Sequence, residues 1–370
     1  MSKLEQIHLA TAGNILDLFT HNKNGSFTLA RKKAGNFICS PISAQIVTLM
    51  TKYGTDNFGK QELSNPSNIS KIETNNLQSY SQLVTNLKNV SNIEIYLGNK
   101  LYVHNQFPTK PFQQLTQLFT SEIEILNIQD TLGTSQNINN WSQRKTNNKI
   151  TNLTSPNDLK DIQLVMVSTG YFKGNWVYPF KYVIKDWFHR SKTDNVAVIM
   201  MCDTAPFNYG PIPNIDAKYI ELPYESNGGD KSFSMYFIIP NEIDGLNGII
   251  EKLHDINFAA LNAPKKNIDV YIPVFKLESE VKLTLAEMEF GGGIRDAYQY
   301  YLKNSKLIHK SFINVELKGS ETEYATILEV EMRTNNDPPE IRIDRPFIAV
   351  IVSKPQNIQL MWARINHPSQ

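Results

Sequence analysis

The feature that most restricts how this chain can fold is a long connection between two strand candidates near its C-terminus. An apolar stretch at Phe312–Val315 precedes the connection, and a second one at Phe347–Val352 follows it. The residues between them show neither a hairpin turn nor helical spacing, and Pro338 and Pro339 interrupt them. Because a connection of about twenty residues in a compact domain is usually functional or disordered, we interpret Leu317–Phe347 as a tethered peptide that another molecule recognises. A disordered surface insertion is the alternative.

Length and charge exclude several classes of function. The chain has 370 residues, of which 41% are apolar, and this is enough for a large core. The 37 basic residues nearly balance the 36 acidic ones, and the net charge is +1. No overall field therefore attracts the chain to nucleic acid or to an anionic membrane. We expect neither a nucleic-acid partner nor a membrane partner.

The N-terminal residues and the cysteines bear on the cellular compartment. No run of about eighteen apolar residues is present that could span a bilayer. Residues 1–8 are too polar for a secretory leader. We expect a secreted protein whose leader is absent from this sequence, with a cytoplasmic protein as the alternative. Cys39 and Cys202 both have apolar neighbours, which favours buried free thiols over a disulfide.

Apolar spacing predicts interleaved strands and helices. The run Leu164–Phe172 is largely apolar, which is typical of a strand buried on both faces. Helical spacing is found at Ile7–Phe19, and Pro41, which follows the capping residue Ser40, begins another helix. The other predicted strands are 93–103, 197–209, 218–223, 232–239, 267–277 and 359–365, and the other predicted helices are 111–119, 138–145, 245–253 and 282–288. Strands and helices do not alternate regularly, so the order favours an α+β fold with large, mostly antiparallel sheets.

No motif for catalysis or for cofactor binding is found. The three glycines at 291–293 lack the spacing of a phosphate-binding loop, and the chain has no HExxH, CxxC or GxSxG sequence. His309 lies in an apolar strand context, which favours a hydrogen-bonded core histidine over a general base. We therefore expect that the protein is not an enzyme and that it binds no metal and no cofactor.

A series of short motifs extends over nearly the whole chain. The motifs are Asn36–Gly54, Ile138–Trp141, Thr146–Ile150, Leu164–Trp176, Glu221–Tyr224, Ser234–Met235, Pro273–Lys276, His309–Lys310, Gly319–Glu321, Asp344–Phe347 and Leu360–Arg364. In this order they resemble the serpin (serine protease inhibitor) superfamily. The resemblance implies a single domain over residues 1–370 with an α+β fold, three β-sheets, about nine helices and an exposed reactive-centre loop at about 318–340.

The resemblance also implies a function. A protease would cleave the reactive-centre loop between Arg333 and Thr334, and the cut loop would insert as a new strand into the central sheet and trap the protease. Arg333 fits the specificity pocket of a trypsin-like serine protease. Met332, one residue earlier, fits a papain-like cysteine protease, so both protease classes stay open as targets. We expect a monomer whose partner is the target protease.

The family pattern assigns two further groups of residues. The hinge, which enters the sheet first, corresponds to Gly319, Ser320, Glu321, Thr322, Glu323, Tyr324, Ala325 and Thr326. The shutter, which affects how the sheet opens, corresponds to Ser40, Ser43, Ser168 and His309. Ser168 stands where the family usually has Asn, and Asn148 stands where it has Gly. Tyr324 would face the core in an inserted strand, where a large side chain overpacks, and Glu323 adds a charge. The alternative function is therefore a non-inhibitory or substrate-like member with a binding or carrier role.

Overall fold

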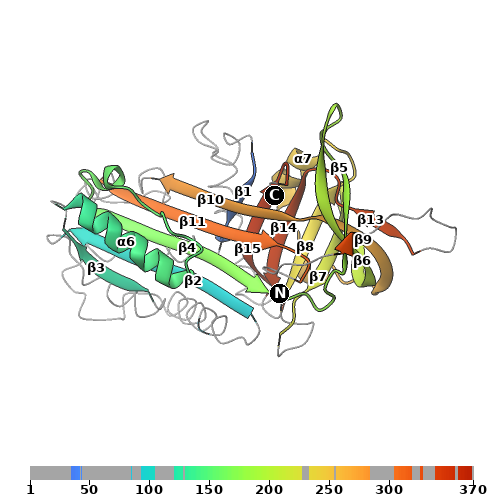
Figure 1. Ribbon diagram of the computed structural model, residues 1–370, viewed down its shortest axis with the longest axis horizontal. Coiled ribbons are helices and arrows are strands. Elements are labelled where there is room, and N and C mark those ends of the chain that lie inside the picture. The colour runs from blue at the N-terminus through green and yellow to red at the C-terminus, as the bar shows by residue number, and fades with distance from the viewer. Residues whose placement is uncertain are drawn as a thin grey trace.

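The computed structural model shows an elongated molecule that consists mainly of β-sheet (Figure 1). The described residues are 35–41, 43, 85, 93–104, 121–127, 130–226, 233–253, 256–283, 304–318, 326–327, 338–354 and 357–368. The helices predicted at 7–19 and 111–119 lie outside these residues, and so does most of the helix that begins at Pro41. Among the described helices, none combines the length and the apolar character that a bilayer crossing requires.

One sheet has five strands in the order β10-β11-β4-β2-β3 (Figure 1). Its strands are β2 (Ile93–His104), β3 (Glu122–Leu126), β4 (Leu164–Gly174), β10 (Phe275–Leu283) and β11 (Ser305–Val315). The central strands β4 and β11 are parallel and directly paired, whereas their outer neighbours β2 and β10 are antiparallel to them. The run Leu164–Phe172 lies in β4 and is buried throughout, as predicted for a strand with both faces covered.

The remaining strands form two sheets that share the long strand β6 (Asp194–Pro211). One has the order β1-β15-β14-β8-β7-β6, with β1 at Phe37–Cys39, β7 at Ala217–Pro223, β8 at Phe233–Pro240, β14 at Phe347–Ser353 and β15 at Ile358–Ile365. In the other, β6 pairs with β5 (Tyr182–Ser191) and β9 (Lys266–Pro273), while β12 (Thr326–Ile327) pairs with β5 and β13 (Glu340–Arg342) with β9. The three expected sheets are therefore present.

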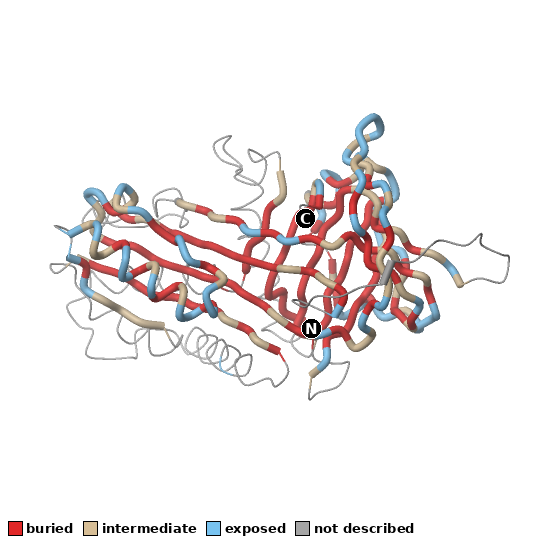
Figure 2. Tube along the Cα trace, viewed as in Figure 1, coloured by how far each residue is buried: buried red, intermediate tan, exposed pale blue. Residues whose placement is uncertain are grey.

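A layer of helix covers one face of the five-stranded sheet. Helix α6 (Thr131–Lys145) lies along this face (Figure 1) and begins at Asp130, whose carboxylate accepts the N–H of Gly133 at 2.7 Å. Ile138 and Trp141 of this helix are buried in a cluster with side chains of β2, β4 and β11. The other described helices are α7 (Leu246–Lys252) and the short 3-10 helices η2 (Pro156–Leu159) and η5 (Phe258–Ala260). Figure 2 shows that buried residues extend along the central strands of all three sheets.

Several element boundaries differ from those predicted. The strand predicted at 267–277 is two strands, β9 and β10, which Val274 separates. The helix predicted at 282–288 is wrong at its start, because Lys282 and Leu283 end β10, and residues 284–288 lie outside the described ranges. From Phe275 to Lys282 every second residue is buried, the period of a strand with one covered face. Helix α6 begins at Thr131 instead of Ile138, and β3 and β5 were not predicted.

Candidate functional site

The base of the predicted reactive-centre loop is fixed where it leaves β11. The carbonyl of Leu317 accepts the N–H of Phe180 at 2.8 Å, and the carbonyl of Lys318 accepts the N–H of Trp176 at 2.9 Å. The indole of Trp176 also donates to the carbonyl of Glu316 at 2.9 Å. Trp176 is itself buried and stacked on Tyr224, with ring centroids 4.4 Å apart. The loop therefore starts from a rigid point between the end of β11 and the turn that follows β4.

The described residues include the two ends of the loop but not its centre. Thr326, the last hinge residue, belongs to β12 and lies opposite Tyr182 of β5 in a parallel pair. Pro338 precedes β13, where the chain re-enters the sheet. The residues that lie outside the described ranges are Gly319, Ser320, Glu321, Thr322, Glu323, Tyr324 and Ala325 of the hinge and Met332, Arg333 and Thr334 of the bait. The roles of these residues stay predictions.

The central strands β4 and β11 form one ladder, which we call the seam, and the family resemblance predicts that the cut loop enters here. The two strands pair without an intervening strand from Ser305 opposite Leu164 to Phe312 opposite Tyr171. Beyond Phe312 the described part of β11 continues to pair with β10, but no longer with β4. The seam therefore ends near the residues from which the loop departs, and from Phe312 back to Ser305 the two strands are directly hydrogen-bonded.

The four predicted shutter residues lie together at the seam, and all of them are fully buried. The Ser40 hydroxyl donates to the carbonyl of Leu360 at 2.9 Å and lies 3.1 Å from the Ser43 hydroxyl. Across the seam, His309 of β11 lies opposite Ser168 of β4, and its Nδ1 is 3.0 Å from the Ser168 hydroxyl. The cluster connects β4, β11, β15 and the helix start at Pro41 in one hydrogen-bonded group.

The hydrogen bonds of His309 determine which ring nitrogen carries the proton. The backbone N–H of Ser40 can only donate, and it lies 3.1 Å from Nε2 of His309. Nε2 must therefore be unprotonated, so Nδ1 carries the hydrogen and donates to Ser168. Burial lowers the pKa of His309 to about 4. His309 is thus a neutral core histidine, as predicted from its strand context.

The fit between the strands at this cluster depends on a glycine. Gly170 of β4 lies opposite Ser311 of β11. A Cβ added to Gly170 would lie 2.7 Å from the Cβ of Ser40 and 3.1 Å from the Ser311 hydroxyl oxygen. Any larger residue would therefore push the start of the helix at Pro41 away from the sheet.

The segment between α6 and β4 is attached to β10 and β11 by polar contacts. Both carboxylate oxygens of Asp158 in η2 are paired: one lies 3.0 Å from Nζ of Lys306 on β11, and the other lies 3.0 Å from Nζ of Lys282 on β10. Lys310 of β11 donates to the carbonyl of Asn152 at 2.9 Å. Because the same segment leads directly into β4, these contacts hold β4 and β11 together.

The charge of Asp158 is stabilised where it lies. Burial alone would raise the pKa of its carboxyl group. The hydrogen bonds from the N–H and hydroxyl of Ser155 and from the two lysines nevertheless hold the pKa far below its usual range. Asp158 is therefore ionised at every pH above the ordinary pKa of an aspartate carboxyl group, and both ion pairs persist in that range.

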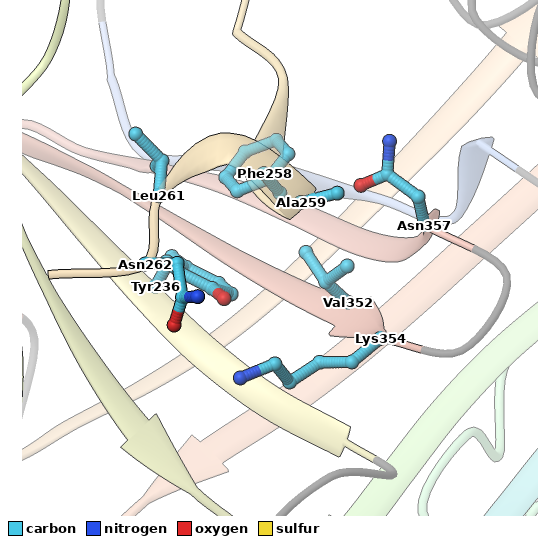
Figure 3. Close-up of a pocket in the computed structure, with 8 residues that line it drawn as sticks. All are labelled: Tyr236, Phe258, Ala259, Leu261, Asn262, Val352, Lys354 and Asn357. Atoms are coloured by element: carbon cyan, nitrogen blue, oxygen red, sulfur yellow. The ribbon is translucent and has the colours of Figure 1, made fainter. Parts of the chain in front are cut away.

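A small pocket lies away from the seam, between β8, η5 and the connection of β14 to β15 (Figure 3). Its volume is about 210 Å³, and Tyr236, Phe258 and Val352 supply apolar lining. Lys354 lies at the pocket and pairs with Glu221. The Oδ1 of Asn357, also in the lining, is buried and has no hydrogen-bond partner within the described structure. The pocket thus combines apolar walls with one unsatisfied acceptor.

Among the described residues, no group of His, Cys, Asp or Glu side chains is arranged to hold a metal ion. Both cysteines are buried free thiols, as predicted. Burial raises the pKa of the Cys39 thiol, and it also raises that of Cys202, to about 11. Neither thiol is therefore ionised near neutral pH.

Three residues that shape the site, Ser311, Asp158 and Trp176, were not predicted as site residues from the sequence. Ser311 lies 2.9 Å from Nε2 of His309 and completes the shutter cluster. It could have been found, because residues two apart in a strand share a face. No local spacing pattern marks Asp158 or Trp176, because their partners are distant in sequence and become neighbours only in the folded sheet.

The comparisons with known proteins agree with this architecture. A family model described as Serpin (serine protease inhibitor) matches residues 25–368. Human Serpin B4 is 26% identical over 374 residues, an alignment that covers 91% of this chain and 95% of the relative. The crystal structure of Serpin48 from the insect Tenebrio molitor has a TM-score of 0.76 at 22% identity and covers 100% of both chains. Human thyroxine-binding globulin in complex with thyroxine has a TM-score of 0.78 at 19% identity, over 99% of this chain and 100% of that one. These structures confirm the expected α+β fold with three sheets.

Proposed function

The chain belongs to the serpin family over residues 25–368, and we propose that it is a protease inhibitor, not an enzyme, built as one domain over residues 1–370. The protease cleaves the loop between Arg333 and Thr334, and the freed hinge then enters the seam between β4 and β11. The observation that carries this proposal is the closed five-stranded sheet, in which two parallel central strands pair next to the base of the loop. We further propose a monomer outside the cell, with the cytoplasm as the alternative location.

Strand geometry explains why insertion is favourable. The loop leaves the end of β11 and turns back, so an inserted strand runs antiparallel to β11 and also to β4, which is parallel to β11. One parallel ladder is then replaced by two antiparallel ladders, and antiparallel pairing is slightly more stable for each residue. The new strand also gains backbone hydrogen bonds on both sides. The uncleaved loop is held back because its two ends are fixed at β11 and β13.

The residue before the cut defines the class of target. Arg333 fits a trypsin-like serine protease, whereas Met332 followed by Arg333 fits a papain-like cysteine protease. The hinge determines whether either protease is trapped or escapes. Tyr324 faces the core in the inserted strand, and overpacking costs about 1–3 kcal/mol, which slows insertion. We therefore expect that, with the Tyr324→Ala variant, fewer inhibitor molecules are cleaved for each protease molecule that is trapped.

The proposal is tested by mixing the protein with trypsin and, separately, with papain. We expect loss of protease activity together with a covalent complex that survives denaturing electrophoresis. Arg333→Ala should abolish the complex with trypsin, whereas Arg144→Ala, which removes an exposed arginine of α6, should not. Cleavage of the loop should also raise the melting temperature, because the inserted strand completes the sheet. An unchanged melting temperature after cleavage contradicts insertion.

A carrier role is the second candidate, and the pocket beside η5 supports it. The relative thyroxine-binding globulin is a family precedent for ligand binding. The volume of about 210 Å³ is below the roughly 300–1,000 Å³ of typical ligand sites, so this role ranks second. Binding of the anionic aromatic dye 1-anilinonaphthalene-8-sulfonate to the native protein, and its loss in Tyr236→Ala, would favour it. If the dye does not bind, the carrier role is excluded and protease inhibition is the single remaining candidate.

A further inference from the structure

The sequence contains a modification motif that the inhibitor function does not use. Asn-X-Ser/Thr, in which X is not proline, accepts N-linked oligosaccharides in proteins that enter the secretory pathway. Asparagine is common in this chain, so the motif alone does not identify an occupied site, and the surroundings of each motif have to decide. Two of the motifs lie among the residues that the structure describes, at Asn140 and Asn152. The others begin at Asn24, Asn68 and Asn89, outside those residues.

The fold leaves room for an oligosaccharide at Asn152. The residue lies between α6 and η2, outside any helix or strand. Its backbone is fixed, because its carbonyl accepts from Nζ of Lys310 at 2.9 Å, and Oδ1 of Asn139 accepts the N–H groups of Leu153 and Thr154. Asn152 itself is exposed, and its side-chain amide has no hydrogen bond to the other described residues. An oligosaccharide on this amide therefore extends into solvent without breaking a contact of the described fold.

The motif at Asn140 has different surroundings. Asn140 is exposed, but its motif lies within helix α6. Trp141, the middle residue, is buried, and the buried hydroxyl of Ser142 donates to the carbonyl of Ile150 at 3.0 Å. Helical hydrogen bonds join near neighbours in sequence, so this motif can become helical while the rest of the chain is still being made. Because the transferring enzyme binds its motif as extended chain, the helix competes with modification at Asn140.

The motif at Asn152 stays accessible for longer, because its attachment to the sheet is made late. Lys310, which binds the carbonyl of Asn152, follows it by 158 residues in the chain. At a synthesis rate of about 5–20 residues per second, Lys310 is added roughly 8–30 s after Asn152. During that time the contact with β11 cannot form, and the motif passes the transferring enzyme unattached to the sheet.

We propose that Asn152 carries an N-linked oligosaccharide and that Asn140 does not, an inference that rests on the proposed location outside the cell. The donor is an oligosaccharide joined through pyrophosphate to a polyprenyl lipid. Nδ2 of Asn152 forms a bond to the anomeric carbon of the first sugar and loses one proton. The bond from that carbon to the pyrophosphate oxygen breaks, and its electron pair leaves with the lipid pyrophosphate. Asn152 stays an uncharged amide, so the ion pairs of Asp158 in the same segment are unaffected.

The test is the mass of two peptides of the protein isolated from its natural source. After denaturation, digestion with trypsin releases Asn152 in the peptide 150–160 and Asn140 in another peptide, which ends at Arg144. Peptide N-glycosidase converts a modified asparagine to aspartate, and heavy-oxygen water marks each conversion. We expect conversion in most copies of the 150–160 peptide and none at Asn140. An unconverted 150–160 peptide overturns the inference, and so does conversion at Asn140 alone.

Variants of the full chain separate the site from the location. They are made in cultured eukaryotic cells behind a secretory leader. Asn152→Gln and Thr154→Ala should each lose the oligosaccharide and migrate faster in denaturing electrophoresis. Thr154→Ser, which keeps the hydroxyl of the motif, and the control Asn140→Gln should migrate as the wild type does. If this wild type is modified at Asn152 and the natural protein is not, the proposed location is wrong; if neither is modified, the site is wrong.

The same proteins separate this inference from the inhibitor function, because each is also mixed with trypsin and with papain. A wild type that traps a protease but lacks the oligosaccharide overturns this inference alone. A wild type that carries the oligosaccharide at Asn152 but inhibits neither protease supports this inference and counts against the inhibitor function alone.

Discussion

Acidification should weaken the shutter cluster through a single residue, His309. Its Nε2 accepts the backbone N–H of Ser40, and its Nδ1–H donates to the Ser168 hydroxyl. A proton on Nε2 would therefore face another N–H. The perturbation is a drop from pH 7 to pH 5, which is low enough to protonate this residue in the unfolded chain but not in the fold.

The magnitude follows from the two pKa values of His309. The folded value is about 4, and the ordinary value is 6.5. The unfolded chain therefore binds more protons between these values, so the free energy of unfolding falls as the pH falls through this window. The full loss is roughly 3 kcal/mol below pH 4, at about 1.4 kcal/mol for each pH unit, and it is about 2 kcal/mol at pH 5.

The assay is urea denaturation at pH 7 and pH 5 at constant ionic strength, with His309→Gln as the control. A glutamine amide oxygen can replace Nε2 as the acceptor for Ser40, and it does not titrate. Between the two pH values the wild type should lose about 2 kcal/mol more than the variant. Equal losses in the two proteins would refute the assignment of the effect to His309.

Three further predictions concern other contacts of the fold. Asp158→Asn removes both ion pairs that attach η2 to β10 and β11 and should lower the free energy of unfolding by about 1–3 kcal/mol, whereas Asp194→Asn, which removes an exposed pair, should change it by less than about 1 kcal/mol. Asn148 has a φ of 61°, so Asn148→Ala should destabilise by about 1 kcal/mol and Asn148→Gly should not. Gly170→Ala should destabilise by about 1–3 kcal/mol through its contact with the helix start. Gly248→Ala, where an added Cβ meets nothing within 4 Å, should stabilise helix α7 by about 0.5–1 kcal/mol. Thermal or urea unfolding of each variant at pH 7 measures these effects, and equal changes in Gly170→Ala and Gly248→Ala would contradict the packing argument.

Elements with one dominant pattern could be predicted from the sequence. Strand β4 was identified because both of its faces are buried and nearly every residue is apolar. Strand β5 was missed because its exposed face carries Lys185 and Trp187, so its residues do not alternate cleanly between apolar and polar. The first half of α6 has few apolar residues and begins at the Asp130 cap, and Asn139 in its second half accepts the N–H groups of Leu153 and Thr154.

The site was predictable to a different degree. The family pattern named the four shutter residues, and the structure places them in contact. It could not give the register of β4 against β11, because that pairing joins segments far apart in sequence and is set by the packed core. For the same reason the contacts of Asp158 with Lys282 and Lys306 could not be inferred from local spacing.

The seam is held by groups of two different kinds, and this makes its opening sensitive to two solution conditions separately. The Asp158 contacts are ionic and partly exposed, so added salt should weaken them while leaving His309 and its serine partners unaffected. Mild acid has the reverse selectivity, because it protonates His309 once the strands have separated and its pKa returns toward 6.5, while Asp158 stays charged. Ionic strength and acidity should therefore have additive effects on the rate at which the two strands separate, each through its own set of contacts.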